Sequence, residues 1–519
     1  MNRRRFVVAV LCTALGASAC STVLAGSPTH SERAPATGRD AATGDLPPAA
    51  TTTFSDCTSQ FQTIVAGRPG SERPLRWECG TMPVPLDYDV VGGTELSIHV
   101  VRGRLDSQHD RIGALFVNPG GPGISGTDLA LNLSLTMPID VLERFDLVGF
   151  DPRGVNFSSP VECVPDAYKD ELYDAEPYVR DDAEFQVQVD IAETIAGMCY
   201  DRYGDELGLI NTMNTARDMD QLRESLGESR LTYLGYSYGT TLGSAYAELF
   251  PENVRALVLD AATDPTLGER AATEAQARGF ESAFDAFAAE CVATGACAAG
   301  ENPQQTVLHV LEDARQSPLP IPGGDGRTVS VGLVLTGVLS SLYSQEMWPA
   351  LAAAIGLAES GDGTGLVQLA DSYTGRQADG TYSNLLEANL SVNCADSAET
   401  FTDVEIRALI EEMRGLYPIF GAPIAANVLS CDRWQAPRHP LPIRNAGGAQ
   451  PIMVIGTTND PATPYTGAQA MTGELDSGFL LTWIGEGHTA YPKTPCITGA
   501  VNAYLIDLRV PTNQNCPAN

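Results

Sequence analysis

One serine of the chain lies in a pattern that suits nucleophilic chemistry. The pattern is Gly235-Tyr236-Ser237-Tyr238-Gly239. Between a strand and a helix, such a pattern makes a sharp turn that holds the serine Oγ clear of the backbone. The two glycines let the strand and helix approach closely, and the helix N-terminus stabilises developing negative charge. The pattern also occurs by chance in chains without this chemistry. Because a strand is expected before it and a helix after it, we predict that Ser237 is a nucleophile.

Three histidines follow Ser237, and one of them is suited to act as its base. The chain order of such sites is serine, then acid, then histidine. His309 lies in a helical run, where a packed or surface histidine is expected, and His439 lies in a proline-rich linker. His488 follows the last expected strand, in Gly-Glu-Gly-His-Thr at 485–489. A turn at that place can bring the imidazole to Ser237, so we predict His488 as the base.

The acid is expected at the end of the preceding strand. Asp460 follows the apolar run 451–456 and could accept the imidazole N–H and stabilise the imidazolium. Alternatively, Asp460 is only a turn or cap residue. Thr463 could orient the histidine–aspartate pair through its hydroxyl, or could merely shape the proline-rich turn.

A glycine-rich loop follows another expected strand. It reads Asn-Pro-Gly-Gly-Pro-Gly at 118–123. We predict an oxyanion hole made by the N–H of Tyr238 and that of Gly120 or Gly121, with an ordinary tight turn as the alternative. The Gly-x4-Gly-Lys-Ser/Thr spacing of phosphate-binding loops is absent from the sequence. Asp151-Pro-Arg153-Gly ends the next strand, and a buried Asp–Arg pair bracing the site is expected there.

The candidate residues described above must be positioned by the ends of strands. The hydrophobic periodicity of the sequence predicts strands that alternate with helices. This alternation predicts an α/β fold with a mostly parallel, doubly wound sheet. The expected strands are 94–102, 112–118, 145–151, 231–235, 254–260, 451–456 and 479–484, and the expected helices of this part are 215–227 and 240–250.

A mainly helical block interrupts the alternation. Residues 265–446 contain helix-like stretches such as 274–291 and 331–342. We interpret this block as a cap over the active-site edge of the sheet. The expected division is therefore a core over 54–264, a cap over 265–446, and the C-terminal part of the core over 447–519.

The N-terminus predicts export. Residues 1–20 combine three arginines with an apolar stretch too short to cross a bilayer, which is typical of a signal peptide. Cys20 follows small residues, as in bacterial lipoprotein signals, so either lipidation at Cys20 or simple cleavage near Ala19 or Ala25 is expected. Residues 21–53 are rich in Ala, Thr, Ser, Pro and Gly and predict a disordered tether. The protein is expected outside the cell or in its envelope.

Ten cysteines remain beyond Cys20, and an even number in an exported chain predicts five disulfides. Nearest-neighbour pairing is the working hypothesis, because each pair then lies within one local segment. No metal site and no cofactor are expected, since Cys-x-x-Cys and His-x3-His spacings are absent from the sequence. The pairs would be Cys57–Cys79, Cys163–Cys199, Cys291–Cys297, Cys394–Cys431 and Cys496–Cys516.

The formal net charge is −33, which argues against nucleic acid and anionic membrane surfaces as partners. Membrane contact is expected only through a lipid on Cys20. The oligomeric state is not determined by the sequence.

Four motifs together resemble a known family. They are Asn-Pro-Gly-Gly-Pro-Gly-Ile-Ser-Gly at 118–126, Asp-Pro-Arg-Gly at 151–154, Gly-Tyr-Ser-Tyr-Gly-Thr at 235–240 and Asp-Pro-Ala-Thr-Pro at 460–464. They resemble the actinobacterial tripeptidyl aminopeptidase and secreted-hydrolase group, serine peptidases related to prolyl aminopeptidases. The resemblance implies an α/β-hydrolase fold with an inserted helical cap, and an exported or lipid-anchored serine exopeptidase.

The resemblance also implies a substrate class, peptides with free N-termini. Prolyl aminopeptidases have histidine where this chain has Pro119, which favours the tripeptidyl branch. Asp396, in the cap, is a candidate anchor for the substrate ammonium, or else a structural carboxylate. An esterase or lipase of the cell envelope using the same triad is the alternative function, and a binding lipoprotein with a vestigial triad is a second.

Overall fold

A ten-stranded sheet organises the part of the chain that the computed structural model describes, residues 46–324, 326–442 and 445–518. Its strands are β1 (Thr53–Asp56), β2 (Leu75–Pro85), β3 (Glu95–Leu105), β4 (Gly113–Asn118), β5 (Phe145–Phe150), β6 (Leu231–Tyr236), β7 (Val254–Asp260), β10 (Ile452–Asn459), β11 (Gly478–Glu486) and β12 (Asn515–Cys516). The strand order is β1-β2-β3-β5-β4-β6-β7-β10-β11-β12. The pairs from β1 to β5 are antiparallel, and all pairs from β5 to β12 are parallel.

The parallel half of the sheet explains why its strands are continuous apolar runs. Parallel strands are joined by crossovers that put helices on both faces, so both faces of each strand are buried. Every residue of β4, β5 and β6 is buried. The predicted mostly parallel α/β sheet is confirmed, and the seven expected strands correspond to β3, β4, β5, β6, β7, β10 and β11.

Strands β1, β2 and β12 were missed by the sequence analysis. β2 pairs antiparallel with β3 along its whole length, and exposed residues alternate with buried ones over much of it. That period-2 pattern is the signal of an antiparallel strand with one solvated face. β1 and β12 are too short to show a period.

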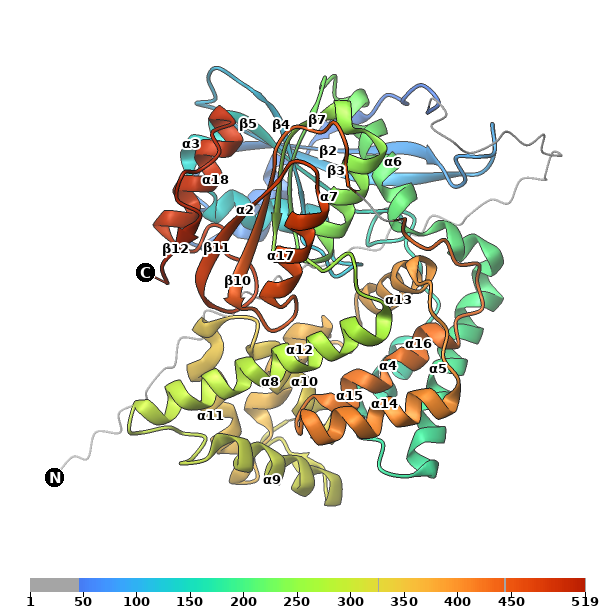
Figure 1. The fold of residues 1–519 in the computed structure, drawn as a ribbon, viewed down its shortest axis with the longest axis vertical. Coiled ribbons are helices and arrows are strands. Elements are labelled where there is room, and N and C mark those ends of the chain that lie inside the picture. The colour runs from blue at the N-terminus through green and yellow to red at the C-terminus, as the bar shows by residue number, and fades with distance from the viewer. Residues whose placement is uncertain (1–45, 325, 443–444, 519) are drawn as a thin grey trace.

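Helices cover the two faces of the sheet (Figure 1). On one face lie α1 (Thr58–Val65), α2 (Gly126–Thr136), α3 (Ile139–Leu142) and α18 (Pro495–Asp507), and on the other lie α6 (Thr212–Ser225), α7 (Tyr238–Leu249) and α17 (Tyr465–Glu474). Leu131 of α2 and Val501 of α18 share a buried cluster with Val117 of β4. Met219 of α6 shares a second cluster with Phe116, the neighbouring β4 residue, because successive side chains of a strand point to opposite faces.

Nine helices of the described chain form the expected cap beside the sheet (Figure 1). They are α8 (Glu269–Ala293), α9 (Pro303–Gln316), α10 (Val331–Ser341), α11 (Trp348–Glu359), α12 (Thr364–Thr374), α13 (Leu385–Asp396), α14 (Asp403–Leu416), α15 (Gly421–Ala426) and α16 (Val428–Asp432), with a two-stranded ribbon of β8 (Leu319–Pro320) and β9 (Thr328–Val329). Phe280, Phe284 and Phe420 pack their rings together at the centre of the cap. The cap therefore has a hydrophobic core of its own.

The cap also contains a segment that precedes Ser237 in the chain. Helix α5 (Asp182–Tyr203) contacts α14 and α16, and helix α4 (Asp166–Asp174) contacts α10 (Figure 1). Phe185 of α5 belongs to the same buried cluster as Phe280, whereas Cys199, near the other end of α5, belongs to a cluster on the sheet. The expected division assigned this whole segment to the core. In the structure, two separate chain segments build the cap.

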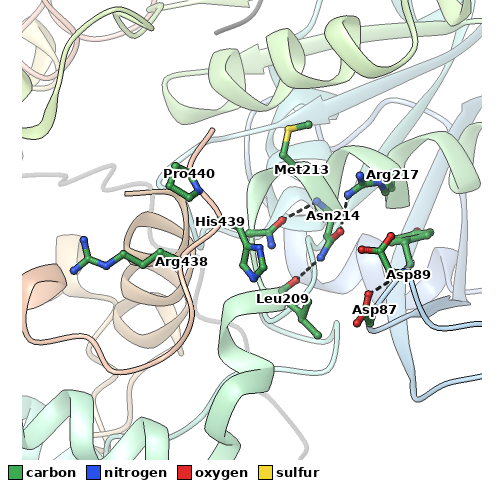
Figure 2. Close-up of a pocket in the computed structure, with 11 residues that line it drawn as sticks. Asp87, Asp89, Leu209, Met213, Asn214, Arg217, Arg438, His439 and Pro440 are labelled. Carbon is green, nitrogen blue, oxygen red and sulfur yellow. Dashed lines mark hydrogen bonds between the residues drawn. The ribbon is translucent and has the colours of Figure 1, made fainter. Parts of the chain in front are cut away.

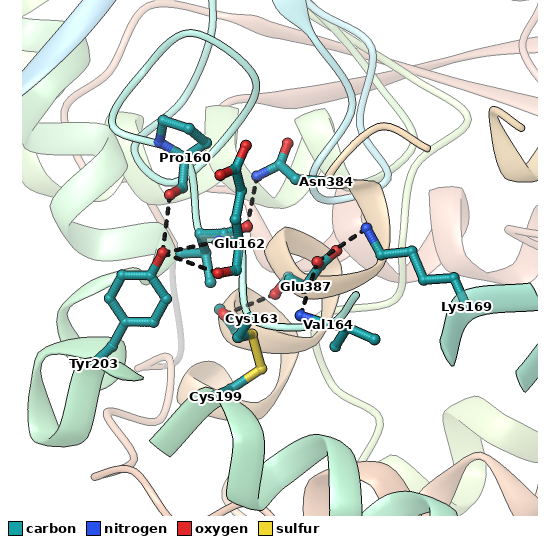
Figure 3. The surroundings of a disulfide bond; sticks show 11 residues. Pro160, Glu162, Cys163, Val164, Lys169, Cys199, Tyr203, Asn384 and Glu387 are labelled. Atoms are coloured by element: carbon teal, nitrogen blue, oxygen red, sulfur yellow. Dashed lines mark hydrogen bonds and ion pairs between the residues drawn. A yellow bond between two sulfur atoms is a disulfide. The ribbon is translucent and has the colours of Figure 1, made fainter. Parts of the chain in front are cut away.

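An ion pair joins these two segments, and a disulfide within the first of them lies close by (Figure 3). Cys163 and Cys199 are bonded beside α13. Lys169 of α4 lies with its Nζ 3.0 Å from Oε1 of Glu387 in α13, and both side chains are almost fully buried. Burial raises the pKa of the Glu387 carboxyl, and the charge of Lys169 opposes that rise. Removing either partner would leave an uncompensated buried charge, so the pair holds α4 against α13.

The ten cysteines beyond Cys20 form five disulfides, and the nearest-neighbour pairing is confirmed for all of them. The expected signal peptide at 1–20, with Cys20, and most of the expected tether at 21–53 lie outside the described residues. Within the described ranges, no helix is both long and apolar enough to span a bilayer.

The prediction that Asp151 pairs with Arg153 is wrong. Arg153 forms a two-pronged ion pair with Asp218 of α6, at 2.6 and 2.7 Å, and both side chains are fully buried. Asp151 instead accepts hydrogen bonds from Ser125 and Thr127 at the start of α2. A guanidinium binds a carboxylate best edge to edge, and tertiary packing places Asp218 in that position.

Replacing Arg153 with alanine should destabilise the protein strongly, because Asp218 would remain buried without its partner. We expect the free energy of unfolding to fall by about 3–5 kcal/mol, measured by urea unfolding. Arg509→Ala is the control, since the Arg509–Asp507 pair is exposed (69% and 52%). Its expected effect is below about 1 kcal/mol. Equal losses in the two variants would contradict the prediction.

Candidate active site

Ser237 occupies the expected turn between β6 and α7. Its φ of 56° and ψ of −124° are rarely adopted by residues with a side chain, so the surroundings must hold the turn. A Cβ on Gly235 would lie 2.5 Å from the carbonyl oxygen of Gly239. A Cβ on Gly239 would lie 2.9 Å from Oδ1 of Asn118. Glycine is therefore required at both positions, for lack of space.

Asp460 and His488 are brought together by neighbouring strands. Asp460 follows β10, His488 follows β11, and Nδ1 of His488 lies 2.9 Å from both carboxylate oxygens of Asp460. The backbone N–H groups of Ala462 and Thr463 also donate to the carboxylate, at 3.0 and 2.9 Å. A proton on Nδ1 satisfies this arrangement and leaves Nε2 as the basic nitrogen.

Ser237 is placed at the same edge of the sheet. The strands β6, β7, β10 and β11 are consecutive and parallel, so the residues that follow them share one edge. Among the described residues, no hydrogen bond joins Ser237 Oγ to His488, whose ring is held by Asp460. Such bonds are often long before a substrate binds.

The loop 118–123 packs directly on the serine turn. A Cβ on Gly120 would lie 2.5 Å from the carbonyl oxygen of Tyr236 and 3.0 Å from the nitrogen of Tyr238. The N–H of Gly120 donates to Oδ1 of Asn118 at 2.9 Å. Of the two glycines left open by the sequence, Gly121 is therefore the better second donor for an oxyanion, beside Tyr238 at the first position of α7.

The fold and the site agree with the comparisons. The family model of the alpha/beta hydrolase fold matches residues 113–495, a span that contains Ser237, Asp460 and His488. The chain belongs to the α/β-hydrolase family.

Curated relatives of this hydrolase carry different names. It is 38% identical over 450 residues to serine protease Hip1 of Mycobacterium tuberculosis, across 82% of this chain and 85% of that protein. It is also 38% identical over 452 residues to carboxylesterase B of the same organism, across 84% and 86%. The tripeptidyl aminopeptidase of Streptomyces coelicolor is 29% identical over 456 residues, across 83% and 81%. The family resemblance drawn from the four motifs is thereby confirmed.

The two other histidines after Ser237 lie elsewhere in this hydrolase. His309 is exposed on α9, 3.7 Å from Asp313 one helical turn away. His439 lines a pocket of about 380 Å³ together with Leu209, Asn214 and Arg217, and none of the candidate site residues lines that pocket (Figure 2). Only His488, of the three, contacts the candidate acid.

Asp396 has structural partners. Its carboxylate accepts hydrogen bonds from the N–H of Thr212 at 3.2 Å and from the Thr212 hydroxyl at 2.5 Å. The same hydroxyl lies 2.5 Å from the hydroxyl of Tyr238. Asp396 thus joins α13 to the start of α6, and these contacts favour the structural alternative over the ammonium anchor.

Sequence reasoning missed a cap residue that touches the candidate base. The backbone carbonyl oxygen of Tyr343, after α10, accepts a hydrogen bond from the backbone N–H of His488 at 2.8 Å. The Tyr343 ring meets the imidazole edge to face, with centroids 5.3 Å apart. On the other side of the site, Asn389 of α13 donates to the carbonyl oxygen of Pro122 at 2.9 Å. No sequence pattern marks either contact, since both depend on how the cap docks.

The described residues include no group of three or more His, Cys, Asp or Glu side chains placed to hold a metal ion.

Thr463 should tune the Asp460–His488 pair. Its hydroxyl lies 3.1 Å from Oδ2 of Asp460 and 3.3 Å from Nδ1 of His488. Thr463→Val keeps the shape and removes one hydrogen bond, which is about 1 kcal/mol. We expect the rate of labelling by a fluorophosphonate to fall about fivefold, and Thr463→Ser to restore it. An unchanged rate in the valine variant would contradict this role.

Proposed function

We propose that the protein is a serine exopeptidase that cleaves short peptides from free N-termini, with Ser237, Asp460 and His488 as its triad. The observation that carries the proposal is the paired contact of His488 with Asp460, at 2.9 Å, at the sheet edge that bears the strained Ser237 turn. The serine protease and aminopeptidase names of relatives support the same reading.

The proposed reaction is acyl transfer through a covalent intermediate. Nε2 of His488 takes the Ser237 proton as Oγ attacks the substrate carbonyl, and Asp460 stabilises the resulting imidazolium. The imidazolium then gives its proton to the leaving amine. Water, deprotonated by His488, hydrolyses the acyl-enzyme and releases the peptide product.

The oxyanion of each tetrahedral intermediate would be bound by the N–H groups of Tyr238 and Gly121. Two such donors, fixed before the reaction begins, stabilise charge that develops only in the transition state. The close packing of Gly120 on the Ser237 turn supports this placement, because it brings the loop to the nucleophile.

The cap supports action at chain ends. It contacts the site from two sides, through Tyr343 at the base and through Asn389 at the glycine loop. A site covered in this way favours a short free chain end over the middle of a folded polypeptide. We further propose that the protein works outside the cytoplasm, which its five disulfides support.

Removing the Ser237 hydroxyl should abolish both fluorophosphonate labelling and turnover, because no other group replaces the nucleophile. Ser237→Ala is compared with Ser244→Ala, a buried serine of α7 whose hydroxyl, in the described part of the chain, donates to the carbonyl oxygen of Thr241 within the same helix. We expect the Ser244 variant to label and turn over like the unmodified protein. Peptidase activity retained in Ser237→Ala would overturn the assignment.

Esterase activity is the second candidate, favoured by the relative named carboxylesterase B at the same 38% identity. Both functions would use one triad, so the substrate must decide. We expect a free tripeptidyl-arylamide to be hydrolysed much faster than its N-acetylated form and than a short acyl ester, measured as kcat/KM. Equal rates for the free and acetylated peptides would remove the aminopeptidase proposal, and preference for the ester would favour the alternative.

A further inference from the structure

A second buried carboxylate lies beside the proposed triad. Asp260 is the last residue of β7, the strand between β6 and β10, and its side chain is completely buried. It belongs to none of the sites predicted from the sequence.

Asp260 bonds to both of the segments that carry the nucleophile and the base. Its backbone carbonyl oxygen accepts the N–H of Ser237 at 2.9 Å. Its carboxylate accepts the N–H of Ala490 at 3.0 Å and that of Tyr491 at 2.8 Å, within the loop that begins at His488. One residue therefore spans the gap between the Ser237 turn and the His488 loop.

The backbone beyond Asp260 is anchored as well. The N–H of Ala261 donates to the carbonyl oxygen of Ile455 in β10 at 3.1 Å, the strand that leads to Asp460. Ala261 has a φ of 60°, a conformation that needs such support. Asp260 and Ala261 together contact the strands or loops of all three triad residues.

The contacts of Asp260 differ from those of other buried aspartates. Asp146 and Asp218 pair with arginines at 3.0 Å or less. Asp260 forms no ion pair within the described ranges, and its carboxylate is bonded only to backbone N–H groups. In the described hydrogen bonds it also contacts neither Ser237 Oγ nor the His488 ring, which Asp460 holds. Asp260 therefore contacts the backbone of the segments that carry Ser237 and His488, and not their reacting atoms.

We propose that Asp260 is a positioning residue, which sets the spacing between the Ser237 turn and the His488 loop. The inference rests on the proposed triad. Oδ2 accepts both N–H groups and Oδ1 accepts that of Ala490 as well, so the ionised carboxylate holds the loop through three contacts.

The protonation state of Asp260 should therefore affect the rate at which Ser237 reacts. Burial raises the pKa of its carboxyl to about 6, while the N–H groups of Tyr491 and Ala490 and the charges of Lys493 and His488 act in the opposite direction. Tyr236 is the titratable group that faces it from β6, and Lys493 Nζ donates to the carbonyl oxygen of His488. As the pH falls through about 6, one oxygen becomes a hydroxyl and an N–H contact is lost.

The acid limb of the pH–rate profile tests this directly. Two protonations should slow fluorophosphonate labelling at low pH, one on His488 and one on Asp260. We expect the logarithm of the labelling rate of the unmodified protein to fall with a slope steeper than one proton. A slope of one in the unmodified protein would overturn the inference without the need for any variant.

Asp260→Asn is the matched substitution, because it keeps the shape and turns an acceptor into a donor facing a backbone N–H. We expect labelling at pH 7.5 to slow by about 10- to 100-fold, since small misplacements of reacting groups have effects of this size. The KM for a peptide substrate should change little, and the acid limb should fall with a slope of one. Asp146→Asn, equally buried but paired with arginines, should reduce the melting temperature and leave the rate and the slope unchanged.

The outcomes separate this inference from the proposed function. Asp260→Asn with an unmodified rate and slope would overturn the inference alone, and so would an equal loss of rate in Asp146→Asn. Labelling that persists in Ser237→Ala would overturn the triad and the inference with it.

Discussion

The turn at Ser237 is the constraint on which the site depends. β6 must reverse into α7 at a single residue with a φ of 56°, and the turn has no room for side chains beside it. A Cβ on Gly235 would meet a carbonyl oxygen at 2.5 Å, and a Cβ on Gly120 would meet another at the same distance. The glycine loop can lie against the nucleophile only because these side chains are missing.

The order of strands solves a second problem, the long insertion between the nucleophile and its partners. Ser237 precedes the larger cap segment and Asp460 follows it, yet β7 and β10 are neighbours in parallel register, with Val258 opposite Met453. The chain leaves the sheet after β7, forms the larger cap segment, and re-enters the sheet as β10, directly beside β7. The cap can therefore be large without separating the three candidate residues, and it contacts the site through Tyr343.

The fold and the candidate triad do not fix the substrate, because they suit many acyl substrates. Two relatives with the same identity to this chain bear protease and esterase names. Asp396, a candidate anchor for an ammonium group, bonds to Thr212 and so helps to fix α13.

Local pattern alone predicted seven of the ten strands of the sheet, the Ser237 turn, and His488 and Asp460 as candidates, and it suggested the cysteine pairing that the structure confirms. These predictions rest on periodicity, glycine spacing, the order of residues along the chain and loop length, all of which can be read from the sequence itself. Tertiary structure decided what local pattern does not encode. Arg153 meets Asp218 rather than Asp151, α4 and α5 join the cap, and Asp260 links the Ser237 turn to the His488 loop. Each of these depends on which distant groups packing brings within hydrogen-bonding or contact distance, and no spacing along the sequence records that.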